Sequence, residues 1–231
     1  MILLRGSLRP PNRLPLSLAR VRERLVEVDR ELTRAADPDP WLDRAAALAR
    51  PADPDPAHGS RVAVLAERLA LELGWPAAAA AQLRRAAELH DIGKLALPRS
   101  LLLHAGPLEP AQRELLALHT HAAGWLLSGL VHPVLRLARV VGRGHHERWD
   151  GRGYPDRTAG TDVPLPARIV AVCDVWDALT HARPYRPALP LADAADTVRR
   201  MAGTAVDPEL SAALLHLLLD PCTSSLPPVR T

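Results

Sequence analysis

The sequence of 231 residues contains no phenylalanine, two tyrosines and two cysteines. Cys173 and Cys222 are too few for a disulfide framework, which favours a reducing cytoplasm over an extracellular location. No apolar run reaches the roughly 18 residues that a membrane-spanning helix needs. Residues 1–16 are interrupted by prolines and do not match a signal peptide. These absences argue against a disulfide-rich or membrane protein, and we expect a soluble cytoplasmic one.

A strong excess of one charge is also lacking. The chain has 29 Lys and Arg residues against 26 Asp and Glu residues, which gives a formal net charge of +3. No basic stripe with interleaved aromatic residues occurs, so we do not expect a nucleic-acid polymer as a partner. The hydrophobic fraction of 48% is carried mainly by Ala, Leu and Val. Ala and Leu at helical spacing predict an all-α protein.

Helical periodicity extends along most of the chain. After a loose arm at residues 1–16, we expect a helix over residues 18–34 and a short helix that contains Trp41 and Leu48. The helices expected in the main body span residues 57–73, 76–90, 110–128, 131–143, 166–180, 191–202 and 207–219.

We divide the chain into an N-terminal helical extension of unknown role at residues 1–55, a main body at residues 56–220 and a C-terminal tail at residues 221–231. Within the body, residues 144–165 are rich in Gly, Pro and Asp and have no apolar period. Loops of this length inside compact domains are usually functional. We therefore expect an ordered loop that contributes to a site.

Histidines and aspartates gather at three points of the main body. His90 and Asp91 are adjacent at the end of an expected helix, and His145 and His146 begin the long loop. Asp174 lies in the otherwise apolar run RIVAVCDVWDAL, where a carboxylate is costly unless it is paired or bound to metal. Imidazole and carboxylate groups with almost no cysteine suggest a multi-metal hydrolytic site rather than a structural zinc site.

Taken singly, most of the other polar residues have ordinary interpretations. His119 alone would be a helix-surface residue, and Lys94 alone would be a surface lysine. Arg183 and Arg186 alone would be solvated loop charges. Asp177 follows Asp174 by about one turn and is a candidate for supporting a ligand. The joint pattern outweighs these separate interpretations.

Six strings, taken together, resemble the HD-GYP family, cyclic di-GMP phosphodiesterases within the HD phosphohydrolase superfamily. They are HGSRV from His58, HDIGK from His90, GPLEP from Gly106, HT at His119, HHERWDGRGYP from His145 and RIVAVCDVWDALTHARPYRP from Arg168. The resemblance extends from about His58 to Leu219. It implies an all-α HD-domain helical bundle with a long GYP loop and a short helical N-terminal extension.

The resemblance also implies two divalent metal ions, with iron or manganese suited to nitrogen and oxygen ligands. One ion would be held by His58, His90 and Asp174, the other by His119, His145 and His146, and Asp91 would bridge them. Some family members carry a glutamate four residues before the first histidine, which supports a third metal. Pro54 stands at that position here, so we expect two ions.

For the reaction, the resemblance implies that Asp91 and Lys94 are catalytic. Asp91 would bridge the ions, and Lys94 would place a cation beside the scissile phosphate. The residues expected to contact substrate are Lys94, Asp150, Gly153, Tyr154, Arg183 and Arg186. The two arginines would hold substrate phosphates.

The function expected from the resemblance is hydrolysis of cyclic di-GMP by a metal-bridged hydroxide, giving linear pGpG and possibly GMP. One rival is an HD phosphohydrolase that acts on another nucleotide, such as a hybrid cyclic dinucleotide. A second rival is a catalytically silent signalling module whose loop binds a protein. A homodimer, or a signalling partner bound through the N-terminal helices or the GYP loop, is also compatible with the sequence.

Overall fold

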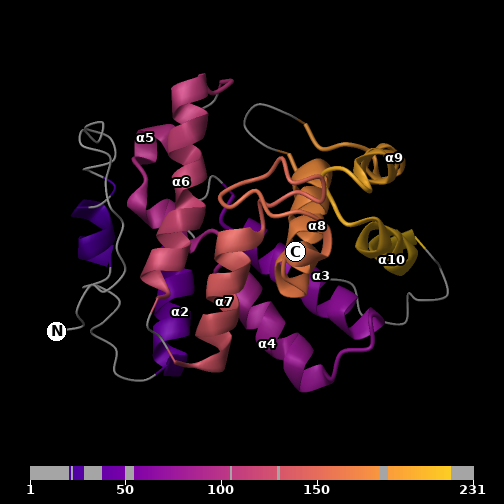
Figure 1. The fold of residues 1–231 in the computed structure, drawn as a ribbon, viewed down its shortest axis with the longest axis horizontal. Coiled ribbons are helices and arrows are strands. Elements are labelled where there is room, and N and C mark those ends of the chain that lie inside the picture. Colours follow the sequence, from indigo (N-terminus) through magenta and orange to yellow (C-terminus); the bar gives the residue numbers. More distant parts are fainter. Residues whose placement is uncertain are drawn as a thin grey trace.

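The computed structural model describes residues 21, 23–28, 38–49, 55–104, 106–128, 131–182 and 187–219. Every regular element in these ranges is a helix (Figure 1), so the expected all-α class is confirmed. Residues 23–28 are helical. The other helices are α2 (Pro38–Ala49), α3 (His58–Glu72), α4 (Ala77–Ala87), η2 (Ile92–Ala96), α5 (Arg99–Leu102), α6 (Pro110–Leu126), α7 (Pro133–Gly144), η3 (Gly160–Asp162), α8 (Leu165–Thr180), α9 (Leu191–Met201) and α10 (Pro208–Leu219).

The helix ends follow local signals. Gly74, with φ of 80°, follows the end of α3, and Pro76 is the N-cap of α4. At the start of α6, the backbone N–H of Glu109 donates to Gln112 Oε1 at 2.8 Å, and a capping box forms. The seven helices expected in the main body are present, with ends shifted by up to three residues.

The short elements η2 and α5 were not expected from the sequence. The helix predicted over residues 76–90 ends earlier, because α4 stops at Ala87 and the chain turns before entering the 3-10 helix η2. A Cβ atom on Gly93 would lie 1.9 Å from the carbonyl oxygen of His119. The backbone of η2 therefore presses directly against that of α6, and only glycine fits at this contact.

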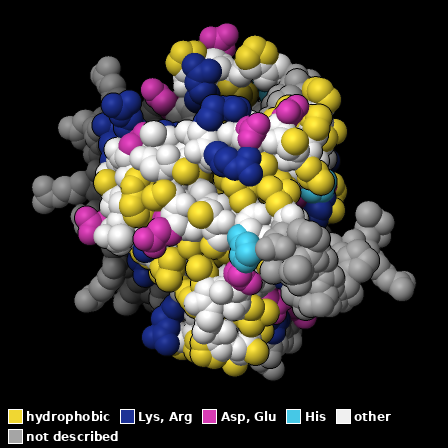
Figure 2. Space-filling view, turned by 90° about the vertical axis from the view of Figure 1, so that its right-hand side faces the viewer, with side chains coloured by type: hydrophobic (Ala, Val, Ile, Leu, Met, Phe, Trp, Pro, Cys, Tyr) yellow, Lys and Arg dark blue, Asp and Glu magenta, His cyan; other side chains and the backbone are white. Residues whose placement is uncertain are grey.

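The main hydrophobic core lies where α3 and α4 pack on α7 and α8, with α9 and α10 closing it on the right of Figure 1. Fully buried side chains include Leu69, Leu83 and Ile169. Figure 2 shows the face that carries α9 and α10, where charges of both signs are interspersed with hydrophobic side chains. In the part of the chain that the structure describes, no helix is long and apolar enough to cross a bilayer.

A second core joins the N-terminal helices to the body. Val28, Leu42 and Ala45 form one buried cluster with Leu89 and Ile92, the residues that flank the His90–Asp91 pair. The helix α2 contacts η2 directly. The predicted boundary at residue 55 thus lies between segments that share a core. The predicted arm at residues 1–16 and the predicted tail at residues 221–231 lie outside the described residues.

Candidate metal centre

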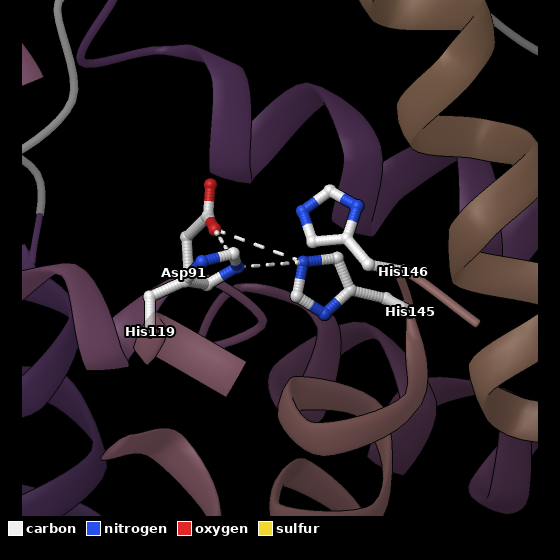
Figure 3. Close-up of side chains that lie close together, drawn as sticks. All are labelled: Asp91, His119, His145 and His146. Atoms are coloured by element: carbon white, nitrogen blue, oxygen red, sulfur yellow. Dashed lines mark hydrogen bonds and ion pairs between the residues drawn. The ribbon is translucent and has the colours of Figure 1, made fainter. Parts of the chain in front are cut away.

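The first ligand group forms around Asp91, the residue that precedes η2. Its partners come from α6, which carries His119, and from the end of α7, which is followed by His145 and His146. The four side chains, here called the His119 group, place ligand atoms within 4.8 Å of one another. Figure 3 shows the rings of His119 and His145 turned toward the carboxylate. Asp91 Oδ1 lies 3.4 Å from His119 Nε2 and 3.7 Å from His145 Nε2.

The second ligand group brings together residues that are far apart in the sequence. His58 begins α3, His90 follows α4, and Asp174 lies in the middle of α8. These three residues, here called the His58 group, also place ligand atoms within 4.8 Å of one another. His58 Nε2 lies 3.1 Å from Asp174 Oδ1, and His90 Nε2 lies 3.3 Å from Asp91 Oδ2. The structure therefore gathers all seven predicted ligands, in the two sets that the resemblance implies.

Backbone carbonyls fix the orientation of three of the rings. His90 Nδ1 lies 2.8 Å from Ala87 O, His119 Nδ1 lies 2.7 Å from Leu116 O, and His145 Nδ1 lies 3.1 Å from Val141 O. A carbonyl oxygen only accepts, so each Nδ1 carries the proton and each Nε2 of the neutral ring presents a lone pair. Metal-bound histidines have this arrangement.

The lone pairs converge where no proton donor satisfies them. His119 Nε2 and His145 Nε2 lie 3.4 Å apart, and neither has a proton to share in the neutral form. His90 Nε2 and Asp91 Oδ1 are buried and have no hydrogen-bond partner. Unsatisfied buried acceptors of this kind are costly. A divalent cation would satisfy all of them together, so the residues fit a metal centre.

Burial favours the neutral form of two rings in the His119 group. It lowers the pKa of His119 to about 3, despite the attraction of Asp91. It also lowers the pKa of His146, and the neighbouring imidazoles of His145 and His119 lower that pKa further. Asp91 stays ionised: burial favours its neutral form, but Lys94 and neighbouring histidines hold its pKa well below the usual value. Neutral imidazoles beside a carboxylate are ready to bind a cation.

His58 has the opposite shift. Burial lowers its pKa, but hydrogen bonds to Asp174 and Asp177 outweigh burial and raise the pKa to about 10. Burial likewise favours the neutral form of Asp174, yet its contact with His58 keeps the pKa of this carboxyl below the ordinary range. A metal that binds Nε2 of His58 must therefore displace a proton.

Asp177 contacts Nδ1 of His58, whereas Asp174 contacts Nε2. Asp177 therefore supports a predicted ligand, as the sequence suggested. Its Oδ2 lies 2.6 Å from His58 Nδ1, and its side chain is buried. Arg61 holds the same carboxylate, with Nε donating to Oδ1 at 2.6 Å and Nη2 to Oδ2 at 2.9 Å. Asp55, next to the proline at position 54, accepts from Arg61 Nη2 at 2.5 Å. No role for Arg61 is predicted from the sequence, although this residue stands in the HGSRV string.

Lys94 places its ammonium group against the carboxylate of Asp91. Its Nζ donates to Asp91 Oδ2 at 2.5 Å, and its side chain is 18% exposed. It lies in η2, three residues after Asp91, and the two side chains meet on one side of this helix. Among the 29 Lys and Arg residues of the chain it is the only lysine.

The GYP loop, residues 144–165, folds back on the predicted metal ligands. Tyr154 lies over the His119 group, with ring centroids 4.9 Å from His146 and 6.3 Å from His119. A Cβ atom on Gly153 would lie 2.5 Å from His146 O, so this close approach requires glycine. Asp150 pairs with Arg148 and accepts from the backbone N–H of Arg152 at 3.0 Å.

Glu147 stabilises this loop by hydrogen bonds. No role for it was predicted from the sequence. It is buried, and its carboxylate accepts the backbone N–H groups of Asp156 at 2.6 Å and Thr158 at 3.1 Å. The backbone N–H of Tyr154 donates to His146 O at 3.2 Å. The expected ordered loop at residues 144–165 is therefore present, with η3 inside it. Arg183 and Arg186 lie outside the described residues.

The chain is similar to known proteins in sequence and in fold. A family model described as "HD domain" matches residues 21–210. The chain belongs to the HD domain family. This match begins at residue 21 and so includes the N-terminal helices of the described structure. The resemblance to the HD-GYP group is also confirmed by the relatives that the chain matches.

Two relatives illustrate the similarity. A cyclic di-GMP phosphodiesterase of Thermotoga maritima is 38% identical over 160 residues, which are 69% of this chain and 44% of the relative. A 3'3'-cGAMP-specific phosphodiesterase 3 of Vibrio cholerae is 40% identical over 169 residues, which are 72% of this chain and 36% of the relative. The chain thus spans less than half the length of these relatives.

A solved structure shares the fold. An HDG"Y"P protein from Bdellovibrio bacteriovorus has a TM-score of 0.56 and 22% sequence identity, with 70% of this chain and 51% of that chain covered. At this identity the likeness concerns the fold, and it agrees with an all-α HD-domain bundle.

Proposed function

We propose that this protein is a metal-dependent phosphodiesterase that hydrolyses cyclic di-GMP to linear pGpG, and possibly further to GMP. The observation that carries the proposal is the convergence of seven nitrogen and oxygen ligands on two adjoining groups that share Asp91 as a neighbour. The names of the relatives support this reaction.

The proposed cofactors are two divalent ions, iron or manganese. The ligand sets contain imidazole and carboxylate and no sulfur, which suits these metals. The His58 group would hold one ion and the His119 group the other, with Asp91 between them. When bound, such a pair supplies a nucleophile at neutral pH and neutralises charge on the phosphodiester.

The chain's own residues would orient and stabilise the substrate. Lys94 is held beside the ligand groups by Asp91, where its ammonium can face a non-bridging phosphate oxygen. Tyr154 lies beside His146, where its ring can pack on the substrate. Asp150 and Gly153 shape the loop around Tyr154. Arg183 and Arg186, which follow the end of α8, are proposed to bind the phosphates of the cyclic dinucleotide.

One alternative substrate has support of its own. Three relatives are named as 3'3'-cGAMP-specific phosphodiesterases, and one of them is 40% identical to this chain. A hybrid cyclic dinucleotide therefore stays a second candidate. A silent signalling module is less well supported, because the ligand set is complete.

The other proposals concern the division of the chain, its location in the cell and its partners. We place the division between an N-terminal extension and the catalytic body at residues 55 and 56, and a C-terminal tail after residue 220. The buried free thiol of Cys173 favours the cytoplasm. We propose no nucleic-acid polymer or membrane as partner. A homodimer or a signalling partner would use the N-terminal helices or the GYP loop.

The decisive experiment is turnover by protein prepared under anaerobic conditions with Mn²⁺ or Fe²⁺. Cyclic di-GMP and 3'3'-cGAMP are each incubated with the loaded protein, and products are separated by chromatography. We expect pGpG from cyclic di-GMP, and none after chelation or in Asp91→Ala. Cleavage of 3'3'-cGAMP alone would select the second candidate. No turnover of either nucleotide by fully loaded protein would contradict the proposal.

A further inference from the structure

Three histidines of the centre are oriented by the backbone of their own region, but His58 is not. His90, His119 and His145 each place Nδ1 against a carbonyl three or four residues earlier. His58 is the first residue of α3, and its backbone N–H donates to Asp55 O at 3.1 Å. Its ring Nδ1 instead lies 2.6 Å from a carboxylate side chain of α8.

That side chain is Asp177, and its position depends in turn on α3. His58 and Arg61 are three residues apart, so both lie on one face of α3. His58 Nδ1 and Arg61 Nη2 both contact Oδ2 of Asp177, while Arg61 Nε donates to Oδ1. The planar guanidinium fork thus fixes the plane of the carboxylate as well as its distance.

We propose that Arg61 is a positioning residue for the metal centre. By holding Asp177, it keeps the ring of His58 with Nε2 toward Asp174 and so sets the affinity of the His58 group for its ion. The His119 group does not use this contact. The inference rests on the proposed metal centre, but it does not depend on which nucleotide is hydrolysed.

A purely structural role is the competing explanation. Arg61 also donates to Asp55 at 2.5 Å, and it ties the start of α3 to α8. If that tie were its whole contribution, removing Arg61 would lower the stability of the metal-free fold and leave metal affinity unchanged once the protein is folded. A positioning role would therefore change the metal affinity, whereas a purely structural role would change only the stability of the metal-free protein.

The test is calorimetric titration of Mn²⁺ into the metal-free full chain. The variants are Arg61→Met and Arg61→Lys, and the matched control is Arg84→Met. Arg84 is also a helical arginine paired with a carboxylate of another helix, since Arg84 Nη1 donates to Glu67 Oε2 at 3.0 Å, but it is half-exposed and away from the ligands. Thermal unfolding of each metal-free variant measures the structural contribution separately.

For Arg61→Met, we expect about 10- to 100-fold weaker binding of one Mn²⁺, the usual loss when the support of a ligand is removed. Binding of the other Mn²⁺ should be unchanged, and Arg61→Lys should restore part of the loss. Unchanged Mn²⁺ affinity in Arg61→Met would overturn the proposal, and so would equal weakening of both ions. If the wild-type chain binds no Mn²⁺, the proposal fails together with the metal centre. Mn²⁺ binding without hydrolysis would remove only the proposed reaction.

A double-mutant cycle identifies the route of the effect. If Arg61 acts through Asp177, then Arg61→Met in an Asp177→Asn background should add little to the loss of affinity. Fully additive losses would mean that Arg61 acts on the centre by another route, and the positioning role would be rejected.

Discussion

The two ligand groups of the centre are built in different ways. In the His119 group, His119 and His145 are separated by 26 residues and are oriented by carbonyls of α6 and α7. In the His58 group, the support of His58 crosses 119 residues to Asp177. One group is therefore specified mainly by local helix geometry. The other depends on correct packing of α3 against α8 and on particular side chains.

This difference predicts where substitutions act. A backbone carbonyl cannot be removed by mutation, so the orientation of His119 and His145 should survive most changes nearby. Asp177 and Arg61 can be changed, so the orientation of His58 is vulnerable. Asp91 links the two groups, because it is a member of the His119 group and also contacts His90 of the His58 group.

The largest effect is expected from Asp91→Ala, which removes the residue that links the two groups. Both ions should be lost, and turnover should fall by at least about 10²–10³-fold, because the charge-stabilising centre is absent. Elemental analysis and turnover of cyclic di-GMP test this. Asp43→Ala, at an exposed aspartate paired with Arg85, is the control. Full retention of two ions would show that Asp91 does not join the groups.

Lys94→Ala should separate catalysis from metal binding. We expect both ligand groups to keep their ions while turnover falls about 10²–10³-fold, since the ammonium acts on the phosphate and not on the metals. Lys94→Arg keeps the charge but not its compact shape, and should recover part of the rate. If Lys94→Ala is as depleted of metal as Asp91→Ala, Lys94 is a structural residue.

Glu147→Ala tests the loop that follows the His119 group. The change removes two part-buried hydrogen bonds from loop N–H groups to a carboxylate, and a hydrogen bond to a charged group contributes about 1.5–3 kcal/mol. We expect the loop to loosen, KM to rise about tenfold, and the metal content of both groups to stay unchanged. Glu147→Gln retains an acceptor oxygen and should be milder. A loss of metal with unchanged KM would assign Glu147 to the ligand groups.

The smallest effect concerns protons. In the metal-free protein the pKa of His58 is raised to about 10, and that of His119 is lowered to about 3. Between about pH 6.5 and 10, His58 therefore keeps a proton that the unfolded chain has lost, and its stabilising contribution disappears as pH rises through 10. Metal binding at pH 7.5 should release this proton from the His58 group and none from His119.

Titration of Mn²⁺ in buffers of different ionisation enthalpy counts the protons released. Apparent affinity for one ion should rise with pH up to about 10, and affinity for the other should show no such rise from His119, whose pKa is lowered to about 3. His58→Ala removes the proton-linked phase and is the control. Two ions with the same pH dependence would mean that the groups do not differ in this way.

Much of the fold could be predicted because its helices carry their own signals. The helix predicted over residues 110–128 begins at a proline after a capping box, and α6 was found there. The 3-10 helix η2 could not be predicted, because it results from the contact of Gly93 with the backbone of α6. That contact is long-range and leaves no periodic pattern in the sequence.

The same division applies to the candidate site. Asp174 was predictable because an isolated carboxylate in an apolar helix is costly. Arg61 was not, because its partner Asp177 lies 116 residues away. Glu147 was not predicted either, because it accepts hydrogen bonds from backbone N–H groups. Every residue but proline has such a group, so the sequence does not mark the partners.

The solitary lysine gives the site a spectroscopic handle that the chain provides by itself. Because Lys94 is the only lysine in the sequence, protein grown with ¹³C- and ¹⁵N-labelled lysine has a single labelled side chain. Its resonances belong to the ammonium that touches Asp91. One signal, free of overlap and without mutation, would follow metal loading, substrate arrival and product departure at the centre.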